Sequence, residues 1–170
     1  MISQATLDDA PELNRLVNSA YRGDSSRQGW TTEADLLDGI RIDPERLTDL
    51  LTKHDSTILK YADEENKILG CVHLERTGVK LYLGMLTVAP NLQRKGIGKQ
   101  LLTTAEQIAR ALFCKSISLT VITDRTELIH WYHRLGYQNT GETKPFPEDD
   151  PRFGLPKKPL EFIVMEKKVK

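Results

Sequence analysis

The stretch of sequence that decides the fold is residues 86–102, which read LTVAPNLQRKGIGKQLL. The strand that leads into it, residues 79–88, ends before Pro90, because proline cannot donate to a β-ladder. After the loop glycines Gly96 and Gly98, apolar residues recur at helical spacing. A strand, a glycine loop and a helix in this order aim free backbone N–H groups and the positive end of the helix dipole at one point. The stretch therefore predicts a binding site for a phosphate or pyrophosphate.

Basic side chains surround the same loop, although the chain as a whole carries no net charge. Arg94, Lys95 and Lys99 lie in or beside the loop, whereas the 170-residue sequence has 24 Lys and Arg against 24 Asp and Glu residues. Balanced charge argues against broad electrostatic attraction to nucleic acid or to an anionic membrane surface. The predicted anion is therefore held locally, by this one loop.

Two better-known glycine loops do not fit this sequence. A Walker loop needs a glycine five residues before the Gly-Lys pair and a Ser or Thr after it, but Gln93 and Gln100 occupy those places. A dinucleotide-binding fingerprint needs a glycine at the third position after Gly98, where Leu101 stands. Both alternatives are excluded by spacing.

On either side of the loop, the sequence predicts strands in a meander and one crossover unit. Alternating apolar residues indicate strands at 56–62, 67–76 and 79–88, and the helix that starts near Gly98 leads to a further strand at 115–123. A strand, a helix and a second strand predict a parallel, right-handed crossover.

The two ends of the chain add shorter elements. The N-terminal part predicts a strand at 2–5 and three helical segments, which begin after Thr6, from Thr32 to Gly39, and after Asp43. The C-terminal part predicts a helix from 124 or 126 to 135, an extended piece at 137–141, a proline-rich loop at 143–159 and a strand at 160–166.

Composition places the chain among globular proteins. With 39% hydrophobic and 28% charged residues, it is expected to form a single domain, residues 1–170. No apolar run reaches the roughly 20 residues of a membrane-spanning helix, and the N-terminus lacks the features of a signal peptide, so a cytoplasmic location is expected. Cys71 and Cys114 lie far apart without Cys or His partners at zinc-site spacing, which predicts reduced core thiols and no metal site.

The pattern Gln93-x-x-Gly96-x-Gly98 after a strand, joined to Tyr132 and the later Gly136-Tyr137, resembles the acetyl-CoA signature of the GNAT superfamily of N-acetyltransferases. The resemblance spans nearly the whole chain. It implies an α/β (α+β) fold: a mixed, mostly antiparallel central sheet of about six or seven strands flanked by helices, with one parallel strand-helix-strand unit at the acetyl-CoA site.

The resemblance also implies that acetyl-CoA is the co-substrate. Backbone groups of Leu86 and Val88 would pair with the pantetheine arm, in a gap between the strands at 79–88 and 115–123. The residues that the resemblance assigns to acetyl-CoA binding are Leu86, Thr87, Val88, Gln93, Arg94, Lys95, Gly96, Ile97, Gly98, Lys99 and Tyr132.

Tyr132 is the candidate general acid. Attack of an amine on a thioester expels a thiolate, and a phenol with a pKa of about 10 can donate a proton to a thiolate whose thiol titrates near 8.5. A backbone N–H, such as that of Leu86, would stabilise the oxyanion. The alternative is that Tyr132 is an aromatic residue of the core.

The general base is harder to assign. The strand at 81–88 has no carboxylate or histidine where several GNAT members place a base, and Arg125 and Leu128 also depart from the family pattern. The candidate bases are Glu33, His73 and Glu75. A relay through bulk water is the alternative to all three.

Candidate acceptor-binding residues are Arg22, Arg27 and Trp30, since arginines recognise carboxylates through paired hydrogen bonds. Solvated arginines are the alternative. The segments GWTTE at 29–33 and RFGLP at 152–156 resemble an uncharacterised branch of the superfamily, which supplies no substrate.

These observations predict an acetyl-CoA-dependent N-acetyltransferase that acts on a primary amine of a small molecule or peptide, by direct attack in a ternary complex. The expected partners are acetyl-CoA and an amine acceptor, without nucleic acid or membrane, in a monomer or homodimer. A non-catalytic acyl-CoA sensor is one alternative, and a thiol-based redox enzyme using Cys71 beside His73 is another.

Overall fold

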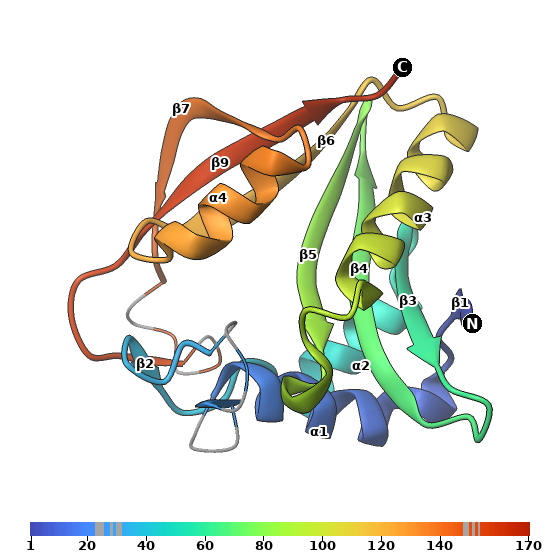
Figure 1. Ribbon diagram of the computed structural model, residues 1–170, viewed down its shortest axis with the longest axis horizontal. Helices are drawn as coiled ribbons and strands as arrows, with labels where there is room; N and C mark the ends of the chain where they lie inside the picture. The colour runs from blue at the N-terminus through green and yellow to red at the C-terminus, as the bar shows by residue number, and fades with distance from the viewer. Residues whose placement is uncertain (23–25, 28, 30–31, 148–149, 151, 153) are drawn as a thin grey trace.

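A seven-stranded sheet is the centre of the fold, in the strand order β1-β3-β4-β5-β6-β9-β7 (Figure 1). The computed structural model describes residues 1–22, 26–27, 29, 32–147, 150, 152 and 154–170. The strands are β1 (Ile2–Gln4), β3 (Ser56–Ala62), β4 (Ile68–Thr77), β5 (Lys80–Val88), β6 (Ser116–Ile122), β7 (Gln138–Pro145) and β9 (Glu161–Lys168). All neighbouring pairs are antiparallel except β5 and β6, which are parallel. The predicted fold class is confirmed.

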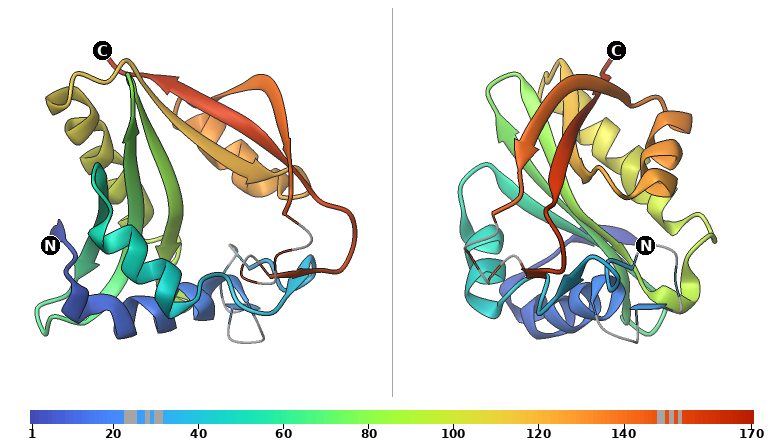
Figure 2. Two further views of the ribbon diagram at one scale, coloured as in Figure 1. Left: turned by 180° about the vertical axis from the view of Figure 1, so that it is seen from behind. Right: turned by 90° about the vertical axis from the view of Figure 1, so that its left-hand side faces the viewer.

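Helices cover both faces of this sheet (Figure 2). They are α1 (Ala10–Tyr21), α2 (Pro44–Thr52), α3 (Ile97–Ala111) and α4 (Thr126–Arg134), with short 3-10 turns η1 (Leu7–Asp9) and η3 (Pro90–Leu92). Apolar residues of α1 and α2 form one core with β3, β4 and β5, and those of α3 and α4 form another on the opposite face. The amphipathic periodicity that predicted these helices is the cause of this layering.

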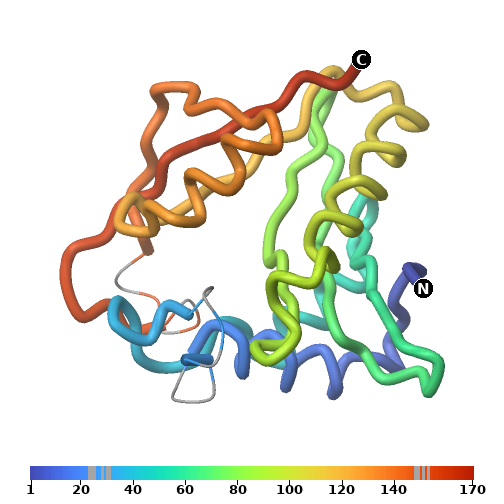
Figure 3. The backbone as a smooth tube through the Cα atoms, viewed as in Figure 1, coloured from blue at the N-terminus to red at the C-terminus, as the bar shows by residue number. Residues whose placement is uncertain are grey.

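Strands β5 and β6 start side by side and then separate (Figure 3). They pair only at Lys80–Ser116, Leu81–Ile117 and Tyr82–Ser118, whereas β6 pairs with β9 along its whole length. Beyond these pairs, β5 contains a bulge: its register with β4 shifts, and Met85 adopts a left-handed φ of 53°. A bulge bends its strand, so β5 turns away from β6 and an opening forms between them.

Two predicted elements are wrong. Residues 32–39 do not form a helix: residues 34–36 form a turn, and β2 (Leu37–Asp38) pairs with β8 (Leu155–Pro156). The loop predicted at 143–159 is shorter, because β7 continues to Pro145 and β8 lies within it. Leu37 is buried in a small cluster with Phe146 and Leu160, so contacts between distant segments override the local helix signal.

Both cysteines, Cys71 and Cys114, are buried and free, as predicted. Burial raises the pKa of the Cys71 thiol to about 12. A thiol with so high a pKa does not form the thiolate that redox chemistry needs, which argues against the redox alternative. None of the helices in the described part of the chain has the length and apolar character needed to span a membrane.

Candidate active site

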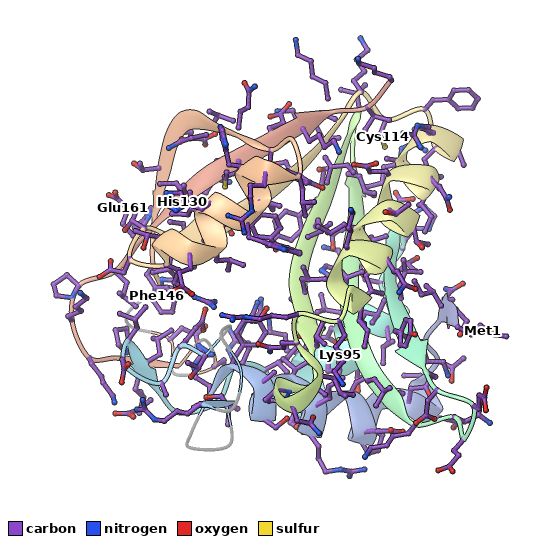
Figure 4. All side chains as sticks on the ribbon, viewed as in Figure 1. Met1, Lys95, Cys114, His130, Phe146 and Glu161 are labelled. Carbon is purple, nitrogen blue, oxygen red and sulfur yellow. The ribbon has the colours of Figure 1, made fainter. Side chains whose placement is uncertain are left out.

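An opening here called the loop cavity lies between β5, the loop before α3, and α4. It has a volume of about 560 Å³, and its lining includes Leu86, Val88, Gly96 and Gly98, together with Tyr132 of α4. Figure 4 labels Lys95 on the loop before α3 and His130 on α4, the two segments that border this cavity. The predicted anion-binding loop therefore forms one wall of a real cavity.

The loop has the backbone geometry that anion binding requires. Arg94 and Gly96 both adopt left-handed conformations, with φ of 70° and 86°, and Gly96 caps the N-terminus of α3. A Cβ on Gly96 would meet nothing within 4 Å, so it is the backbone angle, not space, that requires glycine here. The first N–H groups of a helix have no partner within the helix, and those of 97–99 lie at the cavity wall. This geometry fits a pyrophosphate.

Gln93 holds the loop against the end of β5. Its Nε2 donates to the carbonyl oxygen of Val88 at 3.0 Å. A Cβ built on Gly29 would overlap the flexible end of the Gln93 side chain, so Gly29 lies close to the Gln93 amide. Gln93, predicted at the loop entry, thus positions the loop as well as lining the cavity.

Two of the residues predicted to bind the co-substrate do not line the loop cavity. Thr87 is buried, its hydroxyl donates to the carbonyl of Met85 at 2.9 Å, and it pairs with Cys71 of β4. Alternation along the strand turns Thr87 away from the face that Leu86 and Val88 share. The side chain of Lys95 is exposed outside the cavity. The other predicted residues all line it.

Tyr132 is buried at the meeting point of two cavities. Its ring packs edge-on against Trp131 and Tyr137, with ring centroids 5.0 and 5.5 Å away. Burial raises the pKa of the Tyr132 phenol well above its usual value, so the hydroxyl keeps its proton. Tyr132 lines both cavities.

The second of these, here called the arginine cavity, occupies the opening between β5 and β6 and has a volume of about 210 Å³. It shares Tyr21, Leu86, Leu128 and Tyr132 with the loop cavity. The Tyr21 hydroxyl at the end of α1 donates to the carbonyl oxygen of Leu86. This contact joins the end of α1 to β5.

Glu33 lines the arginine cavity but is bound to two arginines. Its carboxylate oxygens lie 3.0 Å from Arg22 Nη1 and 3.1 Å from Arg125 Nη1, and all three side chains are buried. The oxygens that a general base would use are therefore engaged by guanidinium groups. Arg22, predicted to bind the acceptor, lines the arginine cavity as part of this ion-pair group.

His73 and Glu75 lie apart from Tyr132. They line a third cavity of about 260 Å³, here called the histidine cavity, which Tyr132 does not border. His73 Nε2 lies 2.8 Å from Ser56 Oγ, and burial lowers the pKa of the imidazole to about 4. Glu75 pairs with Lys53 at 3.2 Å. The structure thus separates these two candidate bases from the proposed acid.

Arg27, another acceptor candidate, does not contribute to these cavities. Arg27 is half exposed, pairs with Asp35 at 3.0 Å and lines none of the three. Trp30 lies outside the described residues. Sequence reasoning missed Arg41 and Arg46, which line the arginine cavity. They flank the predicted start of α2, but nothing local indicates that this end of the helix faces β5.

Known proteins resemble the chain in both sequence and fold. A model of the Acetyltransferase (GNAT) family matches residues 13–137. The fold matches the ribosomal-protein-S18-alanine N-acetyltransferase from Escherichia coli with a TM-score of 0.73 at 14% identity, over 100% of this chain and 94% of that chain. An N-acetyltransferase from Staphylococcus aureus Mu50 matches with a TM-score of 0.73 at 16% identity, over 99% of this chain and 97% of that chain.

The IAA acetyltransferase from Bacillus cereus ATCC 14579 matches with a TM-score of 0.68 at 14% identity, over 99% of this chain and 98% of that chain. Such low identities establish the shared fold alone. The family match, however, covers most of the chain and includes both the loop before α3 and Tyr132. The chain therefore belongs to the GNAT family of acetyltransferases.

Proposed function

We propose that this protein transfers the acetyl group of acetyl-CoA to a primary amine by direct attack in a ternary complex. Its family consists of acetyltransferases that use acetyl-CoA as co-substrate. The observation that supports the finer proposal is the meeting of two cavities at Tyr132, one on an anion-binding loop and one in the opening between β5 and β6. A co-substrate in the first and an acceptor in the second would meet beside a protonated phenol.

The residues present fit acetyl-CoA, which supplies an activated acetyl thioester when bound. The N–H groups of 97–99, with Arg94 and Lys99, bind the pyrophosphate. The Ala89 N–H donates to the carbonyl oxygen of Leu69 on β4. Backbone N–H groups alternate between the two sides of a strand, so those of Val88 and Leu86 point away from β4 and toward the opening. Their carbonyls already accept hydrogen bonds from Gln93 and Tyr21, so we expect the Val88 N–H to bind the arm and the Leu86 N–H to face the acyl group.

Tyr132 is the proton donor for the leaving sulfur. As the amine nitrogen bonds to the acyl carbon and the C–S bond breaks, the electron pair goes to sulfur and the Tyr132 Oη proton follows it. The Leu86 N–H stabilises the negative charge on the acyl oxygen. The amine gives up its proton to water. A proton from the solvent then restores the Tyr132 phenol.

Water is the proposed acceptor of the amine proton. Glu33 is engaged by two guanidinium groups, and His73 and Glu75 border a different cavity from Tyr132. A relay through water, the alternative open from the sequence, needs none of these side chains. The proposed base is therefore water, and not Glu33, His73 or Glu75.

Calorimetric titration with acetyl-CoA tests the co-substrate, and thiol release over a panel of amines tests the transfer. We expect saturable binding in the micromolar range and thiol release with at least one class of amine. No binding at high micromolar acetyl-CoA would refute the proposal. Tight binding without thiol release from any amine would instead indicate an acyl-CoA sensor.

The Tyr132→Phe variant tests the acid. Loss of the proton donor is expected to lower kcat about 100-fold while the Kd for acetyl-CoA stays unchanged. The matched control is Tyr137→Phe, because Tyr137 packs against Tyr132 and its buried hydroxyl has no hydrogen-bond partner among the described residues. Unchanged turnover of Tyr132→Phe at every pH would remove Tyr132 as the acid.

A further inference from the structure

A second tyrosine lies where the loop cavity and the arginine cavity meet. Tyr21, the last residue of α1, lines both cavities, as Tyr132 of α4 does. We propose that the Tyr21 hydroxyl oxygen binds the attacking amine of the acceptor, by accepting a hydrogen bond from the amine N–H. The inference rests on the proposed function and adds to it a residue that orients the nucleophile.

The hydroxyl of Tyr21 presents acceptors to a bound molecule. A hydroxyl has one hydrogen to donate and two lone pairs that accept. The Tyr21 hydrogen is donated to the carbonyl oxygen of Leu86, and no other hydrogen bond to this hydroxyl is found within the part of the chain that the structure describes. The lone pairs therefore remain for a donor, and an amine N–H is such a donor.

Burial keeps this hydroxyl uncharged. It raises the pKa of the Tyr21 phenol, and the opposing effects of Arg41 and Arg125 are smaller. A phenol that keeps its proton at neutral pH also keeps its hydrogen bond to Leu86, and it is not a base. Tyr21 therefore orients the amine without taking its proton, which leaves water as the proposed base.

Contacts on every part of the residue fix Tyr21 in place. The guanidinium groups of Arg41 and Arg125 lie 5.5 and 5.9 Å from the centroid of its ring. Its backbone carbonyl accepts a hydrogen bond from the Glu33 N–H at 2.8 Å, and its hydroxyl is bound to Leu86. A group that is fixed before its ligand arrives loses little conformational entropy on binding. The hydroxyl oxygen is thus a preorganised acceptor.

Leu86 places the Tyr21 hydroxyl next to the acyl group. The N–H and the carbonyl of one residue in an antiparallel strand point to the same side of the strand. The Leu86 carbonyl binds Tyr21, so the Leu86 N–H, the proposed donor to the acyl oxygen, lies on that same side of β5. An amine held by the Tyr21 oxygen is therefore close to the acyl carbon.

The two tyrosines reach this point from opposite faces of the sheet. Tyr21 belongs to the core that α1 forms on one face, and Tyr132 to the core that α4 forms on the other (Figure 2). The amine lone pair then attacks the acyl carbon from the side of Tyr21, and the C–S electron pair goes to sulfur together with the Tyr132 proton. The amine gives up its proton to water, so Tyr21 gains and loses none.

The Tyr21→Phe variant of the 170-residue chain tests the inference, because it removes the oxygen and keeps the ring. Thiol release from acetyl-CoA is measured with phenethylamine, glycinamide and spermidine as probes. We expect KM for the amine to rise about five- to tenfold, as for the loss of one hydrogen bond. The kcat at saturating amine and the Kd for acetyl-CoA should stay within about twofold of wild type.

Two control variants match the chemical change. Tyr61→Phe removes the hydroxyl of a half-buried tyrosine on β3 that lines none of the three cavities. Thr140→Val removes a hydroxyl that, like that of Tyr21, donates to a backbone carbonyl, here that of Val164 at 3.2 Å. Both variants should keep the wild-type KM for the amine, since neither residue borders these cavities.

A merely structural role of Tyr21 would give a different result. If Tyr21 only held Leu86 in place, its loss would displace the donor to the acyl oxygen, and kcat would fall while KM for the amine stayed unchanged. That result would overturn the inference, as would an equal rise in KM in Thr140→Val. A loss of acetyl-CoA affinity in Tyr21→Phe as large as the rise in KM would also overturn it.

The outcomes separate this inference from the proposed function. Calorimetric binding of acetyl-CoA by each variant shows that it is folded. Turnover of an amine by the wild type with an unchanged KM in Tyr21→Phe would overturn the inference alone. No thiol release from any amine would overturn the proposed function and this inference together.

Discussion

Glu33 shows how its surroundings decide what a single carboxylate does. In the sequence it is a plausible base, because it is an isolated acid near a loop. In the structure it is buried between Arg22 and Arg125, which bind its oxygens. Removing one partner of a buried ion-pair group leaves the others uncompensated, so the three residues act as a unit. This unit forms one wall of the proposed acceptor site.

His73 predicts a pH dependence of stability. Burial lowers its pKa in the folded protein to about 4, compared with 6.5 in an exposed histidine. Below pH 6.5 the unfolded chain binds a proton that the folded protein does not bind until pH falls to about 4. The free energy of unfolding is therefore unaffected by His73 protonation above pH 6.5 and decreases as pH falls toward 4. The decrease is about 2 kcal/mol by pH 4.5.

Denaturant unfolding of wild type and His73→Asn at pH 7 and pH 4.5 measures this effect. The wild type should lose about 2 kcal/mol more than the variant between the two pH values. The control is His54→Asn, because the His54 side chain is 96% exposed and its removal should leave the pH dependence unchanged. Equal losses in wild type and His73→Asn would contradict the prediction.

At the scale of elements, the loop before α3 shows how much local sequence can determine. Gly96 permits the left-handed turn that begins α3, and no contact with a distant residue is needed for it. The loop was therefore predictable from residues 86–102 alone. The β2 strand was not, because its partner β8 lies more than 100 residues away.

Gly96→Ala is predicted to weaken acetyl-CoA binding about tenfold. An alanine at φ of 86° is strained by about 1 kcal/mol, and relief of that strain turns the N–H groups of 97–99 away from the pyrophosphate. The control is Gly78→Ala in the β4–β5 turn, where φ is 61° and a Cβ also meets nothing within 4 Å. Denaturant unfolding should show a similar loss of stability in both variants.

Calorimetry should show weaker binding of acetyl-CoA only for Gly96→Ala. Equal affinity in the two variants would mean that the geometry of the loop does not determine binding. A loss of affinity in Gly78→Ala of the same size would indicate a general effect of stability.

At the scale of the whole molecule, the site exists because one sheet opens between its parallel strands. β6 is held by β9 along its whole length, while the bulge at Met85 bends β5 away after three paired positions. The opening exposes backbone N–H groups of β5 inside the molecule. Such groups need a partner, which the bound co-substrate is proposed to supply.

Hydrogen exchange measured by mass spectrometry tests this proposal. With saturating acetyl-CoA, we expect slower exchange in peptides that contain 86–88 and 97–99, because their N–H groups gain hydrogen bonds. A peptide from β1 and η1, far from the opening along the sheet, provides the internal control. Protection elsewhere without protection at 86–88 would refute binding in the opening.

The sequence by itself determined the elements whose causes are local: the hairpin of β3 and β4, the crossover from β5 through α3 to β6, and the loop at Gly96. Periodicity and backbone preferences act over a few residues, so they can be read from a single segment. The GNAT resemblance rested on the same local motifs.

Only the tertiary structure decided which side chains share a cavity. Glu33 and Arg125 are 92 residues apart in the chain, and no local signal links them. The bend in β5 and the pairing of β6 with β9 bring them, Tyr132, Arg41 and Arg46 around one opening. Such contacts depend on packing between distant segments, which is why the cationic character of the proposed acceptor site emerged from the fold.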